Sequence, residues 1–300
     1  MYVYQLAAPG VRGARTGLPS VQRPRFTPPE GFAGHEPGSM ARQHPASRPA
    51  YGKPGFSRTT SPVAVHDKSG RYHGGVTRLT AEVVFFDLDD TLFDHHTAAR
   101  AAIADWGRSR GWAGDPTRTA ERWDEYEILY FTQYERGEIS LTAQRTARIR
   151  AFLDQPDLAP ADAMALWEEF RGCYEAHWVA FPDAIAAVTR CRDAGVRVGI
   201  VTNGSTAQQF GKVHTLHLPV DDDAVFISEA VGVAKPDPAI FRVACTAMCV
   251  TPDDALMVGD NPVNDIDCAR TAGLRTVRLD RSGTTPGALT SLDDLVVTRL

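Results

Sequence analysis

Short apolar runs alternate with amphipathic stretches along most of the chain. The run Val83-Val84-Phe85-Phe86 consists of β-forming residues and ends in acid, which is typical of a strand buried in a parallel sheet. Four later strands are expected, each after a stretch with helical spacing, at residues 196–201, 224–227, 255–258 and 274–279. The repeated helix–strand units predict an α/β fold with a doubly wound, mostly parallel sheet, which the strand at 83–86 must join because a lone buried strand leaves backbone groups unpaired.

A long stretch after the first strand has a different period. Residues 97–178 show apolar positions at helical spacing and no convincing strand, with breaks at Gly111–Gly114, Arg136-Gly137 and Gln155-Pro156. We therefore expect an all-helical cap domain at 97–178, inserted into an α/β catalytic core formed by 79–96 and 179–300. Ligands of open parallel sheets bind at the carboxyl edge of the strands, where this insertion begins.

The N-terminal residues lack both periodicities. Of the first 80 residues, 11 are Gly and 10 are Pro, and the stretch carries 11 basic against 3 acidic residues, a net charge of +8. The rest of the chain has a net charge of −13, so the overall −5 averages two unlike parts. We expect residues 1–78 to be a disordered basic extension, because such a segment buries too little surface to offset its chain entropy.

Composition excludes several classes of protein. No apolar run approaches the roughly 18 residues that span a membrane, so no membrane partner is expected. The chain has an odd number of cysteines, five, and no CxxC pair, which favours reduced thiols in a cytoplasmic protein over disulfides or structural zinc. The acidic folded part argues against nucleic acid as the partner.

Polar side chains follow four of the predicted strands. The segments are Asp87–Thr91, Thr202-Asn203-Gly204, a loop with Lys235, and Gly259–Asp265. The carboxylates of Asp87, Asp89, Asp260 and Asp265, which would repel one another at one sheet edge, call for a cation, and hard oxygen ligands suit Mg²⁺. The lysine and a helix N-terminus remain to hold an anion, which is most plausibly phosphate.

These four motifs, in this order, resemble those of the haloacid dehalogenase (HAD) superfamily over about residues 81–280. The match lies in Asp87-Leu88-Asp89-Asp90-Thr91, Thr202-Asn203-Gly204, Ala234–Pro238 and Gly259–Asp265. The position of the insertion resembles the subfamily with a helical type 1 cap, and the motif sequences resemble its phosphatase branch. The resemblance implies a Mg²⁺-dependent phosphatase that acts on a small phosphate ester, as a monomer or homodimer.

The resemblance also assigns roles to the motif residues. Asp87 matches the nucleophile that forms an aspartyl-phosphate, and Asp89 matches the general acid and base. Thr202 and Lys235, with Asn203 beside them, match the residues that bind phosphate.

The metal site is assigned in the same way. Asp260 matches its acidic ligand, together with the Asp87 carboxylate and the Asp89 backbone carbonyl. Asp265 matches the second acid of the fourth motif, which positions the lysine or a metal-bound water.

Other reactions of the superfamily differ in the residues they need. Dehalogenases typically lack the second aspartate of the first motif, so Asp89 disfavours C–halogen cleavage. Phosphonate hydrolysis uses a cap lysine, and no lysine occurs between Ala81 and Phe210. A sugar-phosphate mutase stays open as an alternative, and a non-enzymatic binding protein is disfavoured because Asp87 and Lys235 are both present.

Substrate choice is expected to lie in the helical insertion. Tyr134, Arg145 and Arg148 are candidate substrate-facing side chains, whereas the tryptophans are interpreted as core. Adjacent His95 and His96 point apart on a helix, so a solvent or substrate-gate role is favoured over a metal site. The sequence does not identify the substrate.

Overall fold

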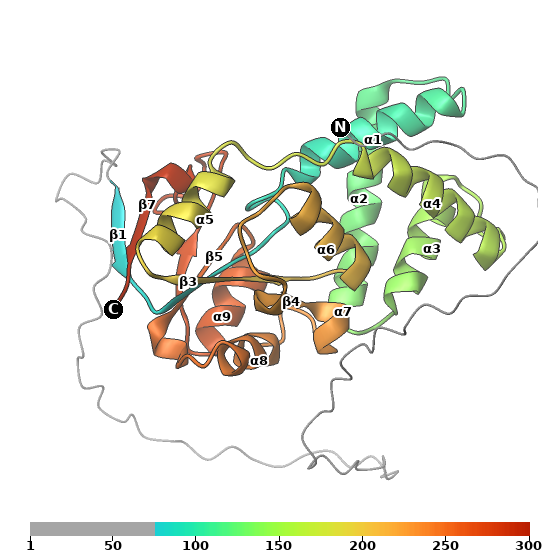
Figure 1. The fold of residues 1–300 in the computed structure, drawn as a ribbon. Coiled ribbons are helices and arrows are strands. Elements are labelled where there is room, and N and C mark those ends of the chain that lie inside the picture. Colours follow the sequence, from blue (N-terminus) through green and yellow to red (C-terminus); the bar gives the residue numbers. More distant parts are fainter. Residues whose placement is uncertain (1–75) are drawn as a thin grey trace, which may run out of the picture. The chain divides into compact units, whose positions relative to one another are not determined.

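A computed structural model describes residues 76–300, and the expectation for residues 1–75 lies outside them. Five parallel strands form the main sheet in the order β4-β3-β2-β5-β6 (Figure 1). Their bounds are β2 Val83–Phe86, β3 Arg197–Thr202, β4 Val225–Ile227, β5 Ala255–Gly259 and β6 Arg275–Arg278. Each lies within about two residues of its predicted range, so the predicted doubly wound α/β fold is confirmed.

The central strand β2 is buried over its whole length because helices cover both faces of the sheet. Val84 packs in the cluster that contains Val188 of α5, whereas Phe85 packs with Phe241 of α8 and Ala269 of α9. The helices around the sheet are α5 Ala184–Asp193, α6 Thr206–Thr215, α7 Ser228–Val231, α8 Ala239–Ala247 and α9 Cys268–Thr271. The fourth motif leads into α9 through a π-helical segment, η3 Pro262–Asp267.

Helices α1 to α4 follow one another between β2 and β3. Their bounds are α1 His95–Ser109, α2 Pro116–Glu135, α3 Leu141–Phe152 and α4 Pro160–Glu175. Trp106, Trp123 and Trp167 are buried between these helices, and the rings of Trp123 and Phe170 lie 4.1 Å apart between centroids. Helix α1 begins two residues before the expected start of the cap, and the division into cap and core domains stays a prediction.

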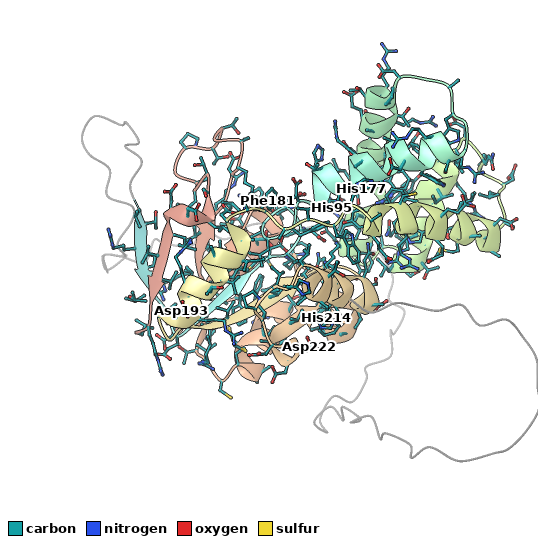
Figure 2. All side chains as sticks on the ribbon, turned by 45° about the horizontal axis from the view of Figure 1, so that its top comes forward. His95, His177, Phe181, Asp193, His214 and Asp222 are labelled. Atoms are coloured by element: carbon teal, nitrogen blue, oxygen red, sulfur yellow. The ribbon has the colours of Figure 1, made fainter. Side chains whose placement is uncertain are left out.

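The chain enters and leaves the helical block through two segments that lie side by side. Phe93 forms an antiparallel bridge with Ala180, the Asp94 N–H donates to the Val179 carbonyl, and the Phe181 N–H donates to the Leu92 carbonyl. Figure 2 shows His95 and Phe181, which flank this crossing, close to one another. The hydrogen-bonded crossing fixes where the block begins relative to the motif that follows β2.

Two strands were not predicted. β1 Thr77–Thr80 and β7 Leu295–Thr298 form a separate parallel pair. The expected disordered extension, 1–78, is therefore wrong at Thr77 and Arg78, which gain backbone hydrogen bonds from a partner more than 200 residues away. In β1 only Leu79 is a strongly apolar residue, so the segment has little hydrophobic pattern of its own. Within residues 76–300, the helices are too short or too polar to cross a bilayer.

A buried polar cluster joins the four helices of the block. His95 of α1 contacts the Tyr174 hydroxyl of α4 through Nδ1 at 2.6 Å and the Glu127 carboxylate of α2 through Nε2 at 3.3 Å. Arg148 of α3 lies 2.8 Å from the same carboxylate. His95 is thus hydrogen-bonded within the block while it also lines the cavity, and His96 is exposed, so the solvent or substrate-gate role stays a prediction.

This cluster makes the stability of the fold depend on pH. Burial alone lowers the pKa of His95, but the Glu127 carboxylate outweighs it and raises that pKa to about 9. An unfolded histidine titrates near 6.5, so the stabilisation from the imidazolium is complete below about pH 6.5 and is lost as the pH rises through about 9.

We predict that His95→Gln reduces the fall in unfolding free energy between pH 6.5 and 9.5. Urea denaturation at both pH values, followed by far-ultraviolet circular dichroism, measures that fall. His96→Gln is the matched control, because it removes an exposed imidazole at the next position. An equal pH dependence in His95→Gln and the wild type would contradict the prediction.

Candidate active site

Three motif side chains meet because their strands are parallel neighbours. Asp87 follows β2, Thr202 ends β3 and Asp260 follows β5, and β2 pairs with both of the other strands. Lys235 comes from the loop between α7 and α8. The structure therefore gathers residues from all four motifs at the carboxyl edge of the sheet, which is where open α/β sheets bind ligands.

Lys235 is the central contact of this group. Its ammonium nitrogen lies 2.6 Å from Asp87 Oδ1 and 2.6 Å from Asp265 Oδ1, and it donates to the Val201 carbonyl at 3.0 Å. Only 3% of the residue is exposed. Burial disfavours the ammonium ion, but the carboxylates of Asp265 and Asp87 outweigh that cost and raise the pKa of Lys235. The lysine is therefore a fixed cation.

The carboxylates at this edge outnumber the cation. Oxygens of Asp87, Asp260 and Asp265 lie within 4.8 Å of one another. Burial and the repulsion of Asp265 raise the pKa of Asp260 to about 7, and burial also raises the pKa of Asp87 well above its usual range, although Lys235 opposes that shift. Lys235 cannot neutralise three carboxylates, so the donor set suits a divalent cation with oxygen ligands.

Gly259 allows this close approach. A Cβ atom built on Gly259 would lie 2.4 Å from Asp265 Oδ2, closer than real contacts allow. The side chain of Asp265 thus lies directly against the last residue of β5. Its Oδ2 also accepts a hydrogen bond from the backbone N–H of Asn261 at 3.0 Å, which fixes the carboxylate that faces Lys235.

Asp89 lies in a different environment from Asp87. Lys212 of α6 contacts its Oδ1 at 2.6 Å, and Gln209 donates to its Oδ2 at 3.1 Å. Burial alone raises the pKa of Asp89, but Lys212, His95 and the hydrogen bond from Gln209 together outweigh it and lower that pKa. Gln209 also donates to the Thr202 hydroxyl at 2.6 Å, so one amide connects the first and second motifs.

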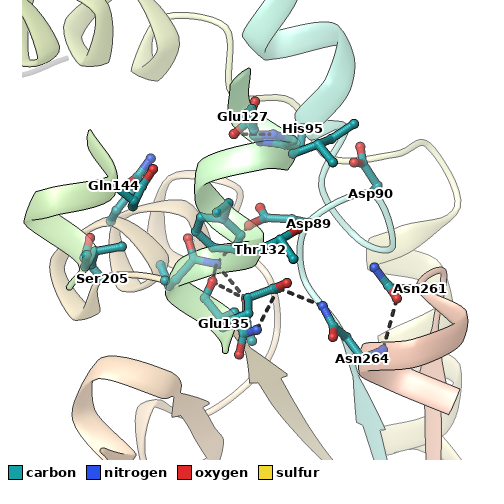
Figure 3. Close-up of a pocket in the computed structure, with 18 of the residues that line it drawn as sticks. Asp89, Asp90, His95, Glu127, Thr132, Glu135, Gln144, Ser205, Asn261 and Asn264 are labelled. Atoms are coloured by element: carbon teal, nitrogen blue, oxygen red, sulfur yellow. Dashed lines mark hydrogen bonds and ion pairs between the residues drawn. The ribbon is translucent and has the colours of Figure 1, made fainter. Parts of the chain in front are cut away.

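The helical block reaches the sheet edge through Glu135, at the end of α2. Its Oε1 accepts hydrogen bonds from Asn203 Nδ2 at 3.0 Å and from Asn264 Nδ2 at 2.7 Å (Figure 3). Asn203 also accepts from the backbone N–H of Lys235 at 2.9 Å. A single carboxylate of α2 thereby holds the second and fourth motifs together.

A cavity of about 540 Å³ lies between the sheet edge and the helices and is lined by Asp87, Asp89, Thr202, Lys235 and Asp260. Of the substrate-facing candidates in the helical block, Arg145 and Arg148 line it. Tyr134 does not, because its hydroxyl lies 2.9 Å from Ser228 Oγ outside the lining.

Three residues of the site were not expected from the sequence. Lys212, Gln209 and Glu135 contact the motif residues through side chains from α6 and α2. The chain has only four lysines among its 32 basic residues, which was a signal available for Lys212. Nothing comparable distinguishes Gln209 or Glu135, since their positions depend on how the helices pack.

Comparison with known proteins supports the resemblance to the haloacid dehalogenase superfamily. Residues 81–273 match the family model for haloacid dehalogenase-like hydrolases. A phosphoserine phosphatase of Thermus thermophilus is 33% identical over 222 residues, which cover 67% of this chain and 89% of that protein. A glyceraldehyde 3-phosphate phosphatase of Methanopyrus kandleri is 32% identical over 200 residues, which cover 67% of this chain and 84% of that protein.

Solved structures show the same fold. A magnesium-bound hydrolase of the HAD type from Bacillus subtilis aligns with a TM-score of 0.64 at 20% identity, over 72% of this chain and 96% of that chain. At this identity the likeness concerns the fold alone. With the motif residues gathered at one sheet edge and the family model matched across all four motifs, the chain belongs to the haloacid dehalogenase-like hydrolase family.

Proposed function

We propose that the protein is a Mg²⁺-dependent phosphomonoester hydrolase that acts on a small phosphorylated metabolite through an aspartyl-phosphate. The observation that carries the proposal is that two carboxylates in one cavity have different hydrogen-bond and charge partners. Asp87 lies beside Lys235 and the acidic cluster, whereas Asp89 is bound separately by Lys212 and Gln209. Two carboxyl groups in different environments take different roles in a two-step reaction.

Asp87 is the nucleophile in this proposal. Its Oδ1 is held by Lys235, which leaves the other carboxylate oxygen to attack phosphorus and release the alcohol. Lys235 and the Thr202 hydroxyl offer donors to the phosphoryl oxygens as negative charge redistributes during transfer. The product is an acyl phosphate on Asp87 and a free alcohol.

Asp89 moves the protons. It donates one to the leaving alkoxide in the first step and takes one from water in the second, when water attacks the aspartyl-phosphate. The nearby charge of the bound phosphate favours the protonated carboxyl before transfer, whereas Lys212 favours the carboxylate afterwards. Hydrolysis returns Asp87 as a carboxylate and releases inorganic phosphate.

The acidic cluster would hold the metal. Asp87 and Asp260 would bind Mg²⁺ through carboxylate oxygens, together with the Asp89 backbone carbonyl, while Asp265 keeps Lys235 in place. When bound, the ion reduces the repulsion between the carboxylate nucleophile and the anionic substrate.

The phosphatase names of the relatives support the same reaction for this chain. Asp89 argues against C–halogen cleavage, because a departing halide needs no proton. A mutase outcome has no specific support in the contacts of the cavity, so hydrolysis is the function proposed.

We predict that Asp87→Asn lowers phosphate release at least about 10³-fold, because an amide cannot form the acyl phosphate. Release of inorganic phosphate from p-nitrophenyl phosphate and a panel of metabolites, with Mg²⁺ present, measures it. Asp223→Asn is the control, because it changes an exposed carboxylate outside the cavity. Wild-type turnover in Asp87→Asn would refute the proposed nucleophile.

Removal of divalent cations by a chelator is expected to reduce turnover about 10²-fold or more, and excess Mg²⁺ is expected to restore it. A second measurement is thermal stability, since a ligand of the folded state raises Tm. Mg²⁺ is expected to raise the Tm of the wild type and to leave that of Asp260→Asn nearly unchanged. Full activity in the chelated enzyme would overturn the metal assignment.

We predict that Asp89→Asn lowers turnover of an alkyl phosphate by about 10²–10⁴-fold, because a poor leaving group needs a proton. The first turnover of p-nitrophenyl phosphate is expected to fall less, because p-nitrophenolate leaves without one. Rapid-mixing measurement of p-nitrophenolate release gives that first turnover. The acid role is wrong if alkyl phosphate hydrolysis is unchanged.

A further inference from the structure

The helical end of the cavity carries positive charge that the proposed phosphate chemistry does not use. Arg145, Arg148 and His95 line this end. The Glu127 carboxylate is shared by Arg148, at 2.8 Å, and His95, at 3.3 Å. Two further carboxylates of α2 line the cavity: Asp124 is bound by Arg100 at 2.7 Å, and Glu135 accepts hydrogen bonds from Asn203 and Asn264. Arg148 and His95 therefore share the Glu127 carboxylate, and none of these α2 carboxylates contacts Arg145.

Arg145 is bound only by neutral groups. Its Nη2 donates to Ser205 Oγ at 3.0 Å and to Gln208 Oε1 at 3.3 Å. Within residues 76–300 no carboxylate oxygen lies within 4.0 Å of its guanidinium. Burial also lowers the pKa of Arg145, because water solvates the cation poorly here. The Glu229 and Glu168 carboxylates oppose this shift from a distance, but neither contacts Arg145. A partly buried guanidinium without a contacting carboxylate in the wall of a cavity is suited to bind an anion from that cavity.

Gln144, the preceding residue of α3, gives independent evidence for a ligand. The residue is only 2% exposed and lines the same cavity (Figure 3). Its Oε1 is buried and has no hydrogen-bond partner within residues 76–300. A buried carbonyl oxygen without a donor is costly, so a ligand that donates a hydrogen bond from the cavity accounts for its place in the lining.

We propose that Arg145 binds an anionic group on the leaving part of the substrate, while Gln144 Oε1 beside it accepts a hydrogen bond from a hydroxyl or amino group of the same molecule. The preferred substrates are then small metabolites with a phosphate ester at one end and a carboxylate or a second phosphate at the other. This inference rests on the proposed phosphatase function and specifies its substrate class.

The geometry favours short molecules. Arg145 contacts Ser205, which follows the phosphate-binding Thr202 by three residues, and three residues span at most about 11 Å even when extended. A nucleoside is a poorer candidate, because Trp167 in the lining is occupied by two guanidiniums, that of Arg145 at 5.2 Å and that of Arg148 at 4.9 Å from its ring centroid.

Matched substrates test the inference. Glycerol 3-phosphate, 3-phosphoglycerate and glycerol 1,3-bisphosphate share a three-carbon skeleton and differ in the group remote from the ester. We expect the wild type to have a kcat/KM for at least one of the two anionic substrates about tenfold or more above that for glycerol 3-phosphate. The comparison between those two identifies the group as carboxylate or phosphate.

Arg145→Gln is expected to reduce this preference about 10- to 100-fold, so that the ratio of kcat/KM values approaches one. Arg145→Lys is expected to restore part of the ratio, since it retains the charge without the planar fork. Arg118→Gln, which removes an exposed arginine of α2 outside the cavity, is expected to leave the ratio at its wild-type value. Circular dichroism and Tm verify that each variant is folded.

The possible outcomes separate the two proposals. A wild type that prefers glycerol 3-phosphate, or an Arg145→Gln variant that is folded and keeps the wild-type ratio, would overturn the inference and leave the phosphatase function standing. If Arg145→Gln does not fold, an unchanged ratio in Arg145→Lys would count against it equally. Failure of the folded wild type to release phosphate from any of these esters and from p-nitrophenyl phosphate would refute the proposed function, and the substrate class with it.

Discussion

Electrostatic repulsion among the carboxylates at the end of β2 is the constraint on which the rest of the site depends. Asp87, Asp260 and Asp265 are brought together by strand pairing and by the close approach of Asp265 to Gly259, and Lys235 is the cation they share. The cluster retains negative charge, which disfavours an incoming phosphate. A further cation at this edge would make such a site compatible with an anionic substrate. The acidity of the site and the Mg²⁺ of the proposed function thus have one physical origin.

A second lysine, Lys212, gives the two aspartates of the first motif different environments. Asp87 and Asp89 are two residues apart, yet one contacts Lys235 and the other Lys212, which come from different segments of the chain. The pKa of Asp87 is raised mainly by burial, whereas that of Asp89 is lowered because Lys212, His95 and Gln209 together outweigh burial. Since proximity alone would couple two such carboxyl groups, separate ammonium partners would let one act as nucleophile and the other exchange protons in the proposed reaction.

The sequence predicted what depends on local pattern. Buried strands appear as apolar runs, and Asp87, Thr202 and Asp260 could be placed at one edge because residues that follow parallel strands share it. The pairing of β1 with β7 was missed because it depends on a partner far along the chain, and no residue of β1 is fully buried. Glu135 was missed for a similar reason. Its contact with Asn203 depends on where α2 ends relative to the sheet. The spacing of apolar residues along the sequence does not predict that position.

The charges of the two walls of the cavity differ in sign, and this limits what can bind between them. The sheet edge is acidic around Asp87 and Asp260. The helical wall carries Arg145 and Arg148, and of these two only Arg148 contacts the Glu127 carboxylate. A phosphate ester with no second charge is oriented only by its phosphate and by packing. An ester with an anion at its far end is also held by the helical wall, which fixes its direction and its length. Because Arg145 contacts Ser205 in the loop that follows Thr202, the same side chain would link the proposed substrate recognition to the position of the helices.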